Sequence, residues 1–386
     1  KLEIDRSKID LVYKEHPELF VRYALRDAEI CYYAFQYLRK FFSTYGVDIL
    51  KHPTIASSTL QAWRNMLKES IFPVEVVYKR DSRYYKGTWR TYLHKRYLFD
   101  GFWSARMLSL FCYWGGRNEA YVRGHMYGKF YYWDVSSLYP NSALIQPLPV
   151  SRTRWIKASK KEDIEKEGFF KVKFEFPKDV DYPCLPVQLE HHDKLYFPLK
   201  GISYCTAPEI RLAKELGCKF RVLKGWVFEP SEPELENPLK SFLDGLVKRK
   251  EESQGLERFM YKMMMNSLIG KFAERVEDIP WELRVEAARL GIPVNRFRKE
   301  FHIGAGFIPE WSSLILGRAR SIISRLVIEN GSLYTATDSL INSAANPKNP
   351  TGLKLKLEAE GDEIYIFRSR LYALYNTVSY THLRAH

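Results

Sequence analysis

The sequence lacks the hydrophobic signals of a membrane or secreted protein. No apolar run approaches the roughly 20 residues that span a bilayer, and no charged-then-apolar leader opens the chain. Internal repeats and low-complexity tracts are also missing. These absences argue against a membrane-spanning or disordered chain, so we expect a soluble protein of the cytoplasm that is not secreted.

Cysteine is scarce and scattered. The five cysteines are odd in number and never form a close pair: Cys31, Cys112, Cys184, Cys205 and Cys218. A zinc site needs closely spaced ligands, and a disulfide framework usually needs an even number of cysteines. Neither is indicated, and a reducing compartment fits this usage best.

Acidic residues are outnumbered by basic ones, 46 Asp and Glu against 60 Lys and Arg, and the formal net charge is +14. Such a balance favours a polyanionic partner, because lysine and arginine neutralise phosphates and release their counterions. Nucleic acid is the first expectation and an acidic membrane surface the second. The 386 residues are 46% hydrophobic and can bury a large core in two or three domains.

Hydrophobic periodicity predicts a mixed α+β chain. Helices are expected at 18–42, 208–216, 239–247, 256–272 and 311–330, and strands at 129–135, 169–176, 220–228 and in a hairpin over 332–342. The segments from 169 to 228 indicate a small α+β insert. Gly331 stands where a C-cap glycine ends a helix.

A first candidate site is the segment DVSSLYP, from Asp134 to Pro140. A carboxylate at the end of a buried strand, followed by a turn with outward N–H groups, suits a metal ion that bridges to a triphosphate. Capping of the short helix that follows explains Asp134 equally well. Taken alone, the segment leaves both interpretations open.

A second carboxylate, Asp338, lies in YTATDSL near the tip of the expected hairpin. Aspartate is common in turns because its side chain bonds to nearby backbone groups. Taken alone, an ordinary turn aspartate is therefore the better explanation of this residue.

The helix expected at 256–272 carries the third candidate. Arg258, Lys262, Asn266 and Gly270 recur every four residues and share one helix face. A solvated charge stripe would look the same, but Asn and Gly weaken a helix interior. This weakness predicts that something approaches the face closely.

Together, two carboxylates and one cationic helix face are the parts that two-metal phosphoryl transfer requires. The metals activate an attacking 3′-hydroxyl and stabilise the leaving pyrophosphate, while the cations hold the triphosphate. The combination predicts a nucleotidyltransferase whose central carboxylates are Asp134 and Asp338.

These three segments, in this order, resemble the three polymerase motifs of family B DNA polymerases, most closely the protein-primed branch of phages and linear plasmids. Residues 113–116 (YWGG) are similar to that branch's YxGG motif, and residues 370–372 (RLY) to its KxY motif, with Arg for Lys. Tyr23 and Asp27, at YxxxD spacing, resemble the third exonuclease motif. The resemblance implies an α+β right-hand polymerase palm and fingers, preceded by a remnant of an RNase H-like 3′–5′ exonuclease domain.

The resemblance also implies roles for single residues. Asp134 and Asp338 would bind metal with the Val135 carbonyl, and Tyr139 would be the steric gate that excludes a 2′-hydroxyl. The other nucleotide-binding residues would be Leu138, Lys250, Arg258, Lys262, Asn266, Ser267 and Gly270, among which Lys262 binds the triphosphate. The DNA contacts would come from Tyr113, Gly115, Gly116, Arg370 and Tyr372.

The implied substrates are deoxynucleotides and a DNA primer–template, and the implied cofactor is a pair of Mg ions, with Mn as the alternative. The implied protein is a monomer of viral, phage or plasmid replication in the host-cell cytoplasm. A terminal (priming) protein is an expected partner, because 152–228 lies where the branch carries its first terminal-protein region. The implied domains are an exonuclease remnant at 1–58, a connector at 59–128, a palm at 129–151 and 276–377, the insert at 152–228 and fingers at 229–275.

The chain departs from the family's pattern at two motif positions. Ala336 replaces the first aspartate of the third motif and is expected to weaken metal binding while catalysis is retained, since one nearby negative charge is gone. Ile269 replaces a tyrosine of the second motif and is expected to reshape the base-pair pocket, with an effect on fidelity or nucleotide affinity.

The ends of the chain also depart from the family. The first two exonuclease motifs would precede Lys1 and the thumb would follow residue 372, so we expect a fragment that does not proofread and synthesises DNA with low processivity. Residues 378–386 (VSYTHLRAH) resemble translated adapter sequence. We expect this tail to be non-native.

Two other functions are compatible with parts of this pattern. A catalytically silent DNA-binding or priming-complex protein of the same fold is motivated by Ala336, Ile269 and the absent segments. An RNA-copying polymerase would carry an Asp-Asp pair at the hairpin tip, which residues 337–339 (TDS) do not match. DNA polymerase activity is therefore the leading interpretation.

Overall fold

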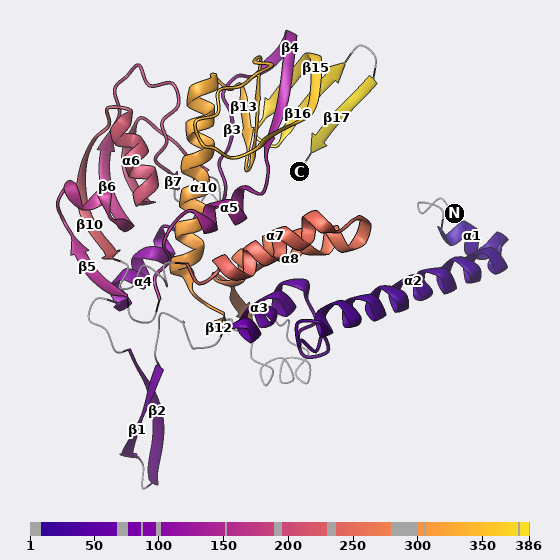
Figure 1. The fold of residues 1–386 in the computed structure, drawn as a ribbon, viewed down its shortest axis with the longest axis horizontal. Coiled ribbons are helices and arrows are strands. Elements are labelled where there is room, and N and C mark those ends of the chain that lie inside the picture. Colours follow the sequence, from indigo (N-terminus) through magenta and orange to yellow (C-terminus); the bar gives the residue numbers. More distant parts are fainter. Residues whose placement is uncertain are drawn as a thin grey trace. The chain divides into compact units, whose positions relative to one another are not determined.

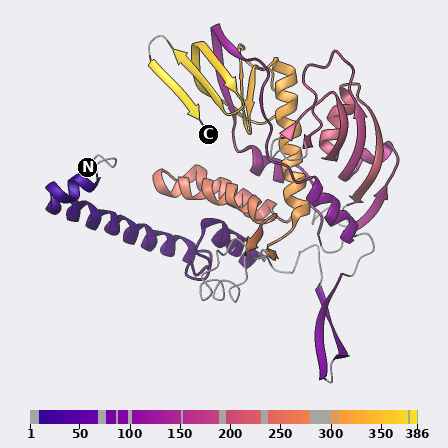
Figure 2. The same cartoon turned by 180° about the vertical axis from the view of Figure 1, so that it is seen from behind.

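The structure is a computed structural model that describes residues 9–67, 76–85, 88–97, 102–150, 153–188, 195–229, 237–278, 300–303, 306–376 and 379–385. The chain forms two compact units, Lys1–Lys68 and Glu69–His386. The first unit is helical in its described part, and the second combines helices and sheets (Figure 1 and, from behind, Figure 2). Among the described residues, every helix falls short of the length and apolar character that a bilayer crossing needs.

Three helices build the described part of the first unit: α1 Ile9–Glu15, α2 Pro17–Ser43 and α3 Ile55–Met66. The side-chain amide of Asn65 donates to the carbonyls of Tyr45 and Gly46 at 3.0 and 3.1 Å, which ties α3 to the turn after α2. The helix expected at 18–42 is confirmed. Since α3 belongs to this unit, the unit extends to Lys68, and the exonuclease remnant expected at 1–58 stays a prediction.

A seven-stranded antiparallel sheet forms one layer of the second unit, with the strand order β17-β16-β15-β4-β14-β13-β3. The strands are β3 Asn118–Ala120, β4 Gly124–Val135, β13 Tyr334–Ala336, β14 Ser339–Asn342, β15 Leu355–Arg368, β16 Leu371–Asn376 and β17 Ser379–Ala385. In this register Asp134 of β4 lies between Ser339 of β14 and Lys356 of β15. The expected strand and the expected hairpin are thereby confirmed.

Helix α10, Pro309–Asn330, lies between this sheet and a smaller one (Figures 1 and 2). Its apolar residues pack with Val135 at the end of β4 and with Leu138 of the short helix α5, Leu138–Leu144. The helix ends at Gly331, whose φ of 52° is the left-handed conformation expected of a C-cap glycine. Most of α10 is buried, so side chains of both sheet domains meet on it.

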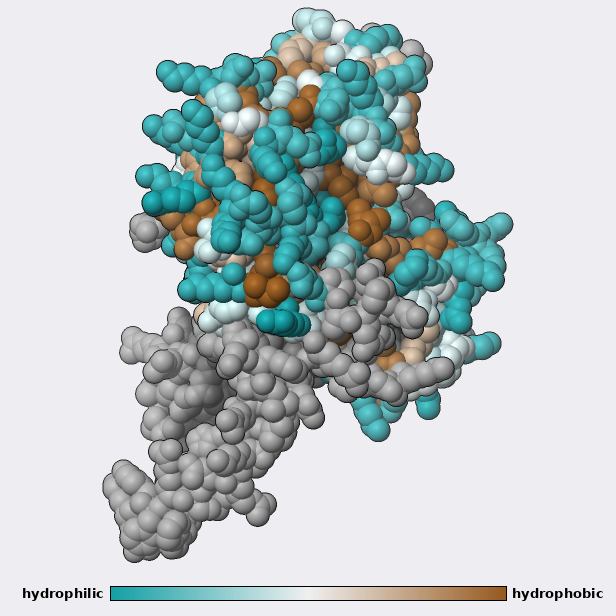
Figure 3. All heavy atoms as spheres, turned by 60° about the vertical axis from the view of Figure 1, so that its left-hand side comes forward, coloured by the Kyte–Doolittle hydropathy of each residue, from teal (hydrophilic) through white to brown (hydrophobic). Residues whose placement is uncertain are grey.

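The smaller sheet has the strand order β5-β10-β6-β9 and confirms the expected α+β insert. The insert contains β5 Arg154–Ala158, the 3₁₀ turn η2 Glu162–Glu165, β6 Glu167–Glu175, β7 Val187–Gln188, β8 Leu195–Tyr196, β9 Lys200–Thr206, α6 Ala207–Glu215 and β10 Lys219–Glu229. Strands β7 and β8 pair with each other in a separate two-stranded sheet. Ile210 of α6 belongs to the same buried cluster as Phe170, Val172 and Val227 of the sheet. Among the described residues on the face drawn in Figure 3, hydrophilic side chains predominate and apolar side chains form smaller patches.

A helical hairpin follows the insert, formed by α7 Lys240–Glu252 and α8 Gly255–Lys271. Gly255 has a φ of 56° at the expected break between the two helices. The other elements are α4 Phe102–Phe111, β1 Val76–Tyr85, β2 Thr88–Tyr97, β11 Arg275–Asp278 and β12 Glu300–Ile303. The connector expected at 59–128 lies partly outside the described residues, since 68–75, 86–87 and 98–101 are not among them.

Candidate active site

Asp134 and Asp338 lie side by side although they are far apart in the sequence. Asp134 is the penultimate residue of β4, and Asp338 lies in the two-residue turn between β13 and β14. The backbone N–H of Val135 donates to the carbonyl oxygen of Asp338 at 2.8 Å. Both aspartates are half-buried and line one cleft, as the sequence predicted.

The turn that carries Asp338 has a strained backbone. Thr337 has a φ of 60°, a left-handed conformation that β-branched residues rarely adopt. Its N–H donates to the carbonyl of Arg117 at 2.8 Å, and its hydroxyl donates to Oδ1 of Asn118 at 3.2 Å. These hydrogen bonds offset the strain and fix the tip of the turn to the start of β3.

Helix α5 decides between the two interpretations of Asp134. The N-cap residue of this helix is Ser137, and no side chain caps it. Asp134 lies outside the cap, so the capping explanation is excluded. The side-chain amide of Asn141 instead donates to the carbonyl of Ser136 at 3.0 Å, which tightens the turn between β4 and α5.

A cleft of about 630 Å³ contains both carboxylates and the cationic helix face. Its sheet side is lined by Asp134, Val135, Ser136, Ser137, Leu138, Tyr139, Asp338, Lys356 and Glu358. Its helical side is lined by Lys250, Gly255, Arg258, Phe259, Lys262 and Asn266. The structure therefore brings together nine of the residues that the sequence singled out, from segments that the chain separates widely.

Two other predicted nucleotide-binding residues do not line this cleft. Ser267 is half-buried, and its hydroxyl donates to the carbonyl of Met264 within α8 at 3.3 Å. Gly270 is exposed, with open space where a side chain would lie. Gly270 thus shares the exposed face of Arg258, Lys262 and Asn266, as expected, and leaves room for a close approach.

Negative charge accumulates on the sheet side of the cleft. Burial, together with the charges of Asp338 and Glu358, raises the pKa of Asp134 to about 6, while Lys262 and Lys356 oppose the shift. An ionised Asp134 is thus costly in the protein alone. A bound cation would offset this cost, because it would interact favourably with each of these carboxylates.

Positive charge accumulates on the helical side. Burial lowers the pKa of Lys250, and the neighbouring charges of Arg258 and Lys262 lower it further. The guanidinium of Arg258 donates to the backbone carbonyl of Lys250 at 3.0 Å, which holds the Arg258 side chain at the α7–α8 turn. Three crowded cations across from two carboxylates suit a polyphosphate chelated to a metal.

Sequence reasoning missed Lys356 and Glu358. Lys356 pairs with Asp134 across β4 and β15, and its ammonium lies 2.7 Å from a carboxylate oxygen of Glu358. A register shift between Leu357 and Ala359 marks a β-bulge at Glu358. The only sequence signal was an alternating polar pattern that any exposed strand shows, so neither residue was recognisable before the strands were paired.

The YWGG loop, residues 113–116, lies against the catalytic turn. A side chain at Gly116 would meet Cγ2 of Thr337 at 2.9 Å and the hydroxyl of Tyr139 at 3.0 Å, so only glycine fits there without a shift. Gly115 is exposed and faces open space, and Tyr113 is half-buried. The loop is thus part of the surroundings of the site, whereas its predicted contact with DNA stays a prediction.

The RLY motif gives one correction. Arg370 is exposed with a φ of 65°, and its N–H donates to the hydroxyl of Tyr334 at 2.8 Å. Tyr372 is only 3% exposed and packs with Tyr132 and Tyr334 in the core of the large sheet. Its ring is therefore not available for the predicted DNA contact and supports the strands that carry the site.

The motif departures lie in different environments. Ile269 is 4% exposed and is not among the residues that line the cleft, and its predicted effect on the base-pair pocket stays a prediction. Ala336 ends β13, two residues before Asp338, and is half-buried. Its predicted effect on metal binding stays a prediction.

The exonuclease-like pair lies in the first unit. Tyr23 is half-buried and Asp27 is exposed, one turn apart on α2. Among the described residues no group of three or more His, Cys, Asp or Glu side chains is placed to hold a metal ion. The predicted role of this pair remains open to experiment.

Carboxylates at the end of β4 and in the turn before β14, opposite a cationic helical hairpin, define a palm and fingers of the right-hand polymerase class. The chain belongs to the type B DNA polymerases of the organellar and viral kind, since a family model with that description matches residues 18–281, more than half of the chain. This match confirms the family indicated by the sequence motifs.

Curated relatives agree with this assignment. The chain is 31% identical over 280 residues to the "Primer-independent DNA polymerase PolB" of Escherichia coli, a match that covers 66% of this chain and 31% of the relative. It is 32% identical over 181 residues to a "Probable DNA polymerase" of Podospora anserina, covering 46% of this chain and 14% of the relative. The chain thus spans about a third or less of these relatives.

Solved structures of Phi29 DNA polymerase share the fold. An orthorhombic crystal form superposes with a TM-score of 0.60 at 16% identity, covering 86% of this chain and 59% of that one. A ternary complex with primer-template DNA and incoming nucleotide substrates superposes with a TM-score of 0.57 at 16% identity, covering 87% of this chain and 60% of that one. This likeness confirms the expected α+β polymerase fold.

Proposed function

We propose that this chain is the polymerase part of a DNA-directed DNA polymerase, which adds deoxynucleotides to a primer 3′-hydroxyl by two-metal phosphoryl transfer. The observation that carries the proposal is the single cleft in which Asp134 and Asp338 face Lys250, Arg258 and Lys262. The biological setting that we propose is viral, phage or plasmid DNA replication in a host cytoplasm, and the viral part agrees with the family description, "organellar and viral".

The donors in the cleft fit divalent magnesium. Mg²⁺ prefers oxygen ligands and is usually held by one or two carboxylates together with substrate phosphates and water. Asp134, Asp338 and the Val135 carbonyl would supply the protein ligands. Bound there, Mg²⁺ or Mn²⁺ would lower the pKa of the attacking hydroxyl and neutralise charge on the leaving pyrophosphate.

The protein's own groups would bind and orient the nucleotide. Lys262 and Arg258 would hold the triphosphate, with Lys250 behind them at the α7–α8 turn. Tyr139 lines the same cleft, and its ring would stack under the deoxyribose and exclude a 2′-hydroxyl. The backbone N–H of Val135, through its bond to Asp338, would keep the two carboxylates in register.

The source of the first hydroxyl is a separate part of the proposal. The Escherichia coli relative is named primer-independent, whereas a Phi29 neighbour was solved with primer-template DNA. For this chain we propose extension of a DNA primer, and the hydroxyl of a terminal protein docked on the insert domain as the alternative. Tyr23 and Asp27 are proposed as remnants of an exonuclease site.

Single-nucleotide extension of a short DNA primer–template, with Mg²⁺ or Mn²⁺, tests the activity. Extension should disappear in Asp134→Ala and Asp338→Asn and persist in Asp244→Asn, which removes an exposed carboxylate of α7 outside the cleft lining. Templates without a primer, run in parallel, show whether a DNA 3′ end is needed. Salt-sensitive DNA binding without any extension would favour the catalytically silent DNA-binding protein instead.

A further inference from the structure

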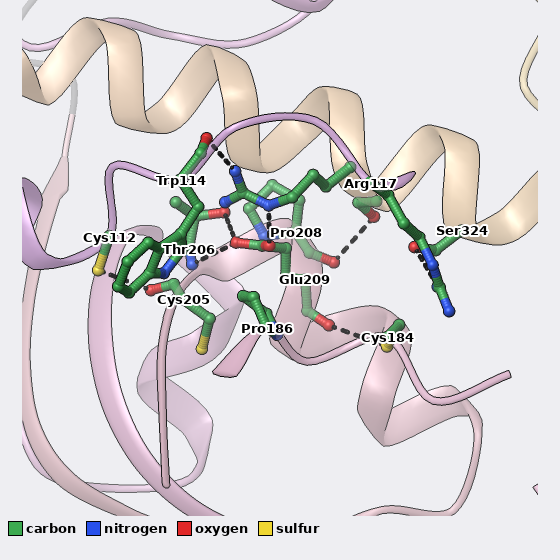
Figure 4. Close-up of polar contacts among 12 residues, drawn as sticks. Cys112, Trp114, Arg117, Cys184, Pro186, Cys205, Thr206, Pro208, Glu209 and Ser324 are labelled. Carbon is green, nitrogen blue, oxygen red and sulfur yellow. Dashed lines mark hydrogen bonds and ion pairs between the residues drawn. The ribbon is translucent and has the colours of Figure 1, made fainter. Parts of the chain in front are cut away.

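Arg320 and Glu209 form an ion pair that is almost completely buried. Their side chains are 0% and 1% exposed, and Nε of Arg320 donates to Oε1 of Glu209 at 2.8 Å. The other carboxylate oxygen of Glu209 accepts from the N–H and the hydroxyl of Thr206 at 2.8 and 2.9 Å. Figure 4 shows Glu209 and Thr206 beside the helix. The pair therefore joins α10 to the start of α6 in the insert domain.

Gly317, one turn before Arg320 on α10, makes this approach possible. A side chain there would come within 2.1 Å of the Thr206 hydroxyl and 2.9 Å of Glu209 Oε2. The insert domain is thus packed directly onto the backbone of α10 at this level. The contact between α10 and the insert domain is tightly packed. A substitution at Arg320 or Glu209 therefore cannot be absorbed by small shifts of the neighbouring atoms.

The same arginine holds the YWGG loop. Nη1 of Arg320 donates to the carbonyl of Trp114 at 2.6 Å and to that of Gly115 at 3.1 Å. The indole N–H of Trp114 donates to the carbonyl of Tyr204 on β9 at 2.8 Å. The loop is therefore fixed between α10 and the insert domain just before Gly116.

Gly116 links the position of the YWGG loop to the geometry of the site. Its backbone leaves no room for a side chain beside the Tyr139 hydroxyl and Thr337. The next residue, Arg117, accepts the N–H of Thr337 through its carbonyl at 2.8 Å. A displacement of the loop would consequently move the Tyr139 ring and the turn that carries Asp338.

A buried charge pair of this kind is weak evidence for stability alone, because desolvation offsets much of the attraction. The Arg320 guanidinium also donates to two carbonyls of the YWGG loop. An apolar pair could not fix the loop in this way. Arg106 and Glu310 form a comparable buried pair, with bonds of 2.7 and 3.2 Å between α4 and α10. Neither residue lines the cleft, so this second pair is a matched control.

We propose that Arg320, oriented by Glu209, is a positioning residue that sets the YWGG loop against Tyr139 and Thr337 and thereby tunes selection of the nucleotide sugar. The inference rests on the proposed function, since sugar selection is a property of nucleotide incorporation. The insert domain acts in this way on the choice of substrate without touching the nucleotide.

The proposal can be tested by measuring how strongly three variants prefer deoxynucleotides over ribonucleotides. Arg320→Lys and Glu209→Gln should lower the ratio of kcat/KM for deoxynucleotide over ribonucleotide by between about twofold and thirtyfold, and Glu310→Gln should leave it unchanged. In a Tyr139→Val background, neither change should lower the ratio further, because both act through that ring. An equal loss in Glu310→Gln, or additive losses with Tyr139→Val, would overturn the proposal.

Backbone hydrogen exchange tests the positioning without any need for activity. The amides of residues 114–118 and of Thr337 should exchange faster in Arg320→Lys and Glu209→Gln than in the unaltered chain or in Glu310→Gln. Unchanged exchange contradicts the inference whether or not the protein incorporates nucleotides. Faster exchange in an inactive protein would contradict only the proposed function. Should Arg320→Lys fail to fold, Gly116→Ala displaces the loop from its other end and should give the same loss of discrimination.

Discussion

The backbone N–H of Val135 donates to the carbonyl oxygen of Asp338 at 2.8 Å, and this one bond ties the end of β4 to the turn between β13 and β14. The carboxylates of the site stand on either side of it, on Asp134 and Asp338. Because the bond belongs to the backbone, side-chain substitutions at either aspartate should leave the frame of the site intact. Such variants therefore report on charge and chemistry more than on folding.

Asp134→Asn should stabilise the metal-free protein near pH 7. Burial raises the pKa of Asp134 to about 6, above the roughly 3.9 of an unfolded chain, so ionisation lowers stability as the pH rises from about 4 to 6. We expect a gain of roughly 1 kcal/mol after allowance for screening of this partly exposed group. Thermal denaturation at pH 4 and pH 7 measures it, and the gain should vanish at pH 4.

Metal should reverse that order of stability. Mg²⁺ or Mn²⁺ should raise the melting temperature of the unaltered chain and have little effect on Asp134→Asn or Asp338→Asn, since ligands that bind only the folded state stabilise it. Removal of the metal with a chelator should restore the melting curve that the unaltered chain gives without metal. A metal-induced shift of the same size in all three proteins would place the metal elsewhere.

Lys262→Ala should weaken binding of the incoming nucleotide. One charge-assisted hydrogen bond contributes about 1.5–3 kcal/mol, so KM for the nucleotide should rise by roughly tenfold to a hundredfold, with a small change in DNA affinity. Steady-state extension and DNA-binding titrations separate the two effects. The control is Lys248→Ala, which removes an exposed cation of α7 that pairs with Glu252. If Lys262→Ala lowers DNA affinity alone, Lys262 contacts the DNA backbone and not the incoming nucleotide.

Tyr139→Val should admit ribonucleotides, because removal of the ring opens space beside the sugar C2′. A steric contact of this kind is worth about 1–3 kcal/mol, which corresponds to roughly a 10-fold to 200-fold loss of discrimination. Tyr139→Phe keeps the ring and should retain most of the discrimination. Competition between ribo- and deoxynucleotides measures the ratio, and an unchanged ratio in Tyr139→Val would refute the gate.

Glu358→Gln should raise the metal concentration needed for half-maximal activity. Glu358 lines the cleft and adds to the negative charge at Asp134, so its loss makes the site less attractive to a cation. We expect an increase of about tenfold, the lower end of an outer-shell contribution to metal affinity. Glu360→Gln, two residues along β15 and outside the cleft lining, should have no such effect. If a metal titration gives the same curve for both variants, Glu358 does not contribute to metal binding at the site.

Local sequence patterns were sufficient for the elements that carry the site. The four-residue repeat from Arg258 to Gly270 gave the exposed face of α8 correctly, because side chains four apart stack on one face of any helix. Gly331 marked the end of α10, because only glycine reaches the left-handed conformation without cost. These features depend on neighbours within a few residues, so they can be inferred without the fold.

The sequence by itself determined the family, the two aspartates and the cationic helix face, since these are local motifs in a fixed order. Only the tertiary structure decided that Ser137 and not Asp134 is the N-cap residue of α5, that Lys356 and Glu358 lie beside Asp134, and that Tyr372 is buried. It also placed Arg320 between Glu209 and the YWGG loop. Each of these facts depends on strand register or helix packing between distant segments, which no local pattern specifies.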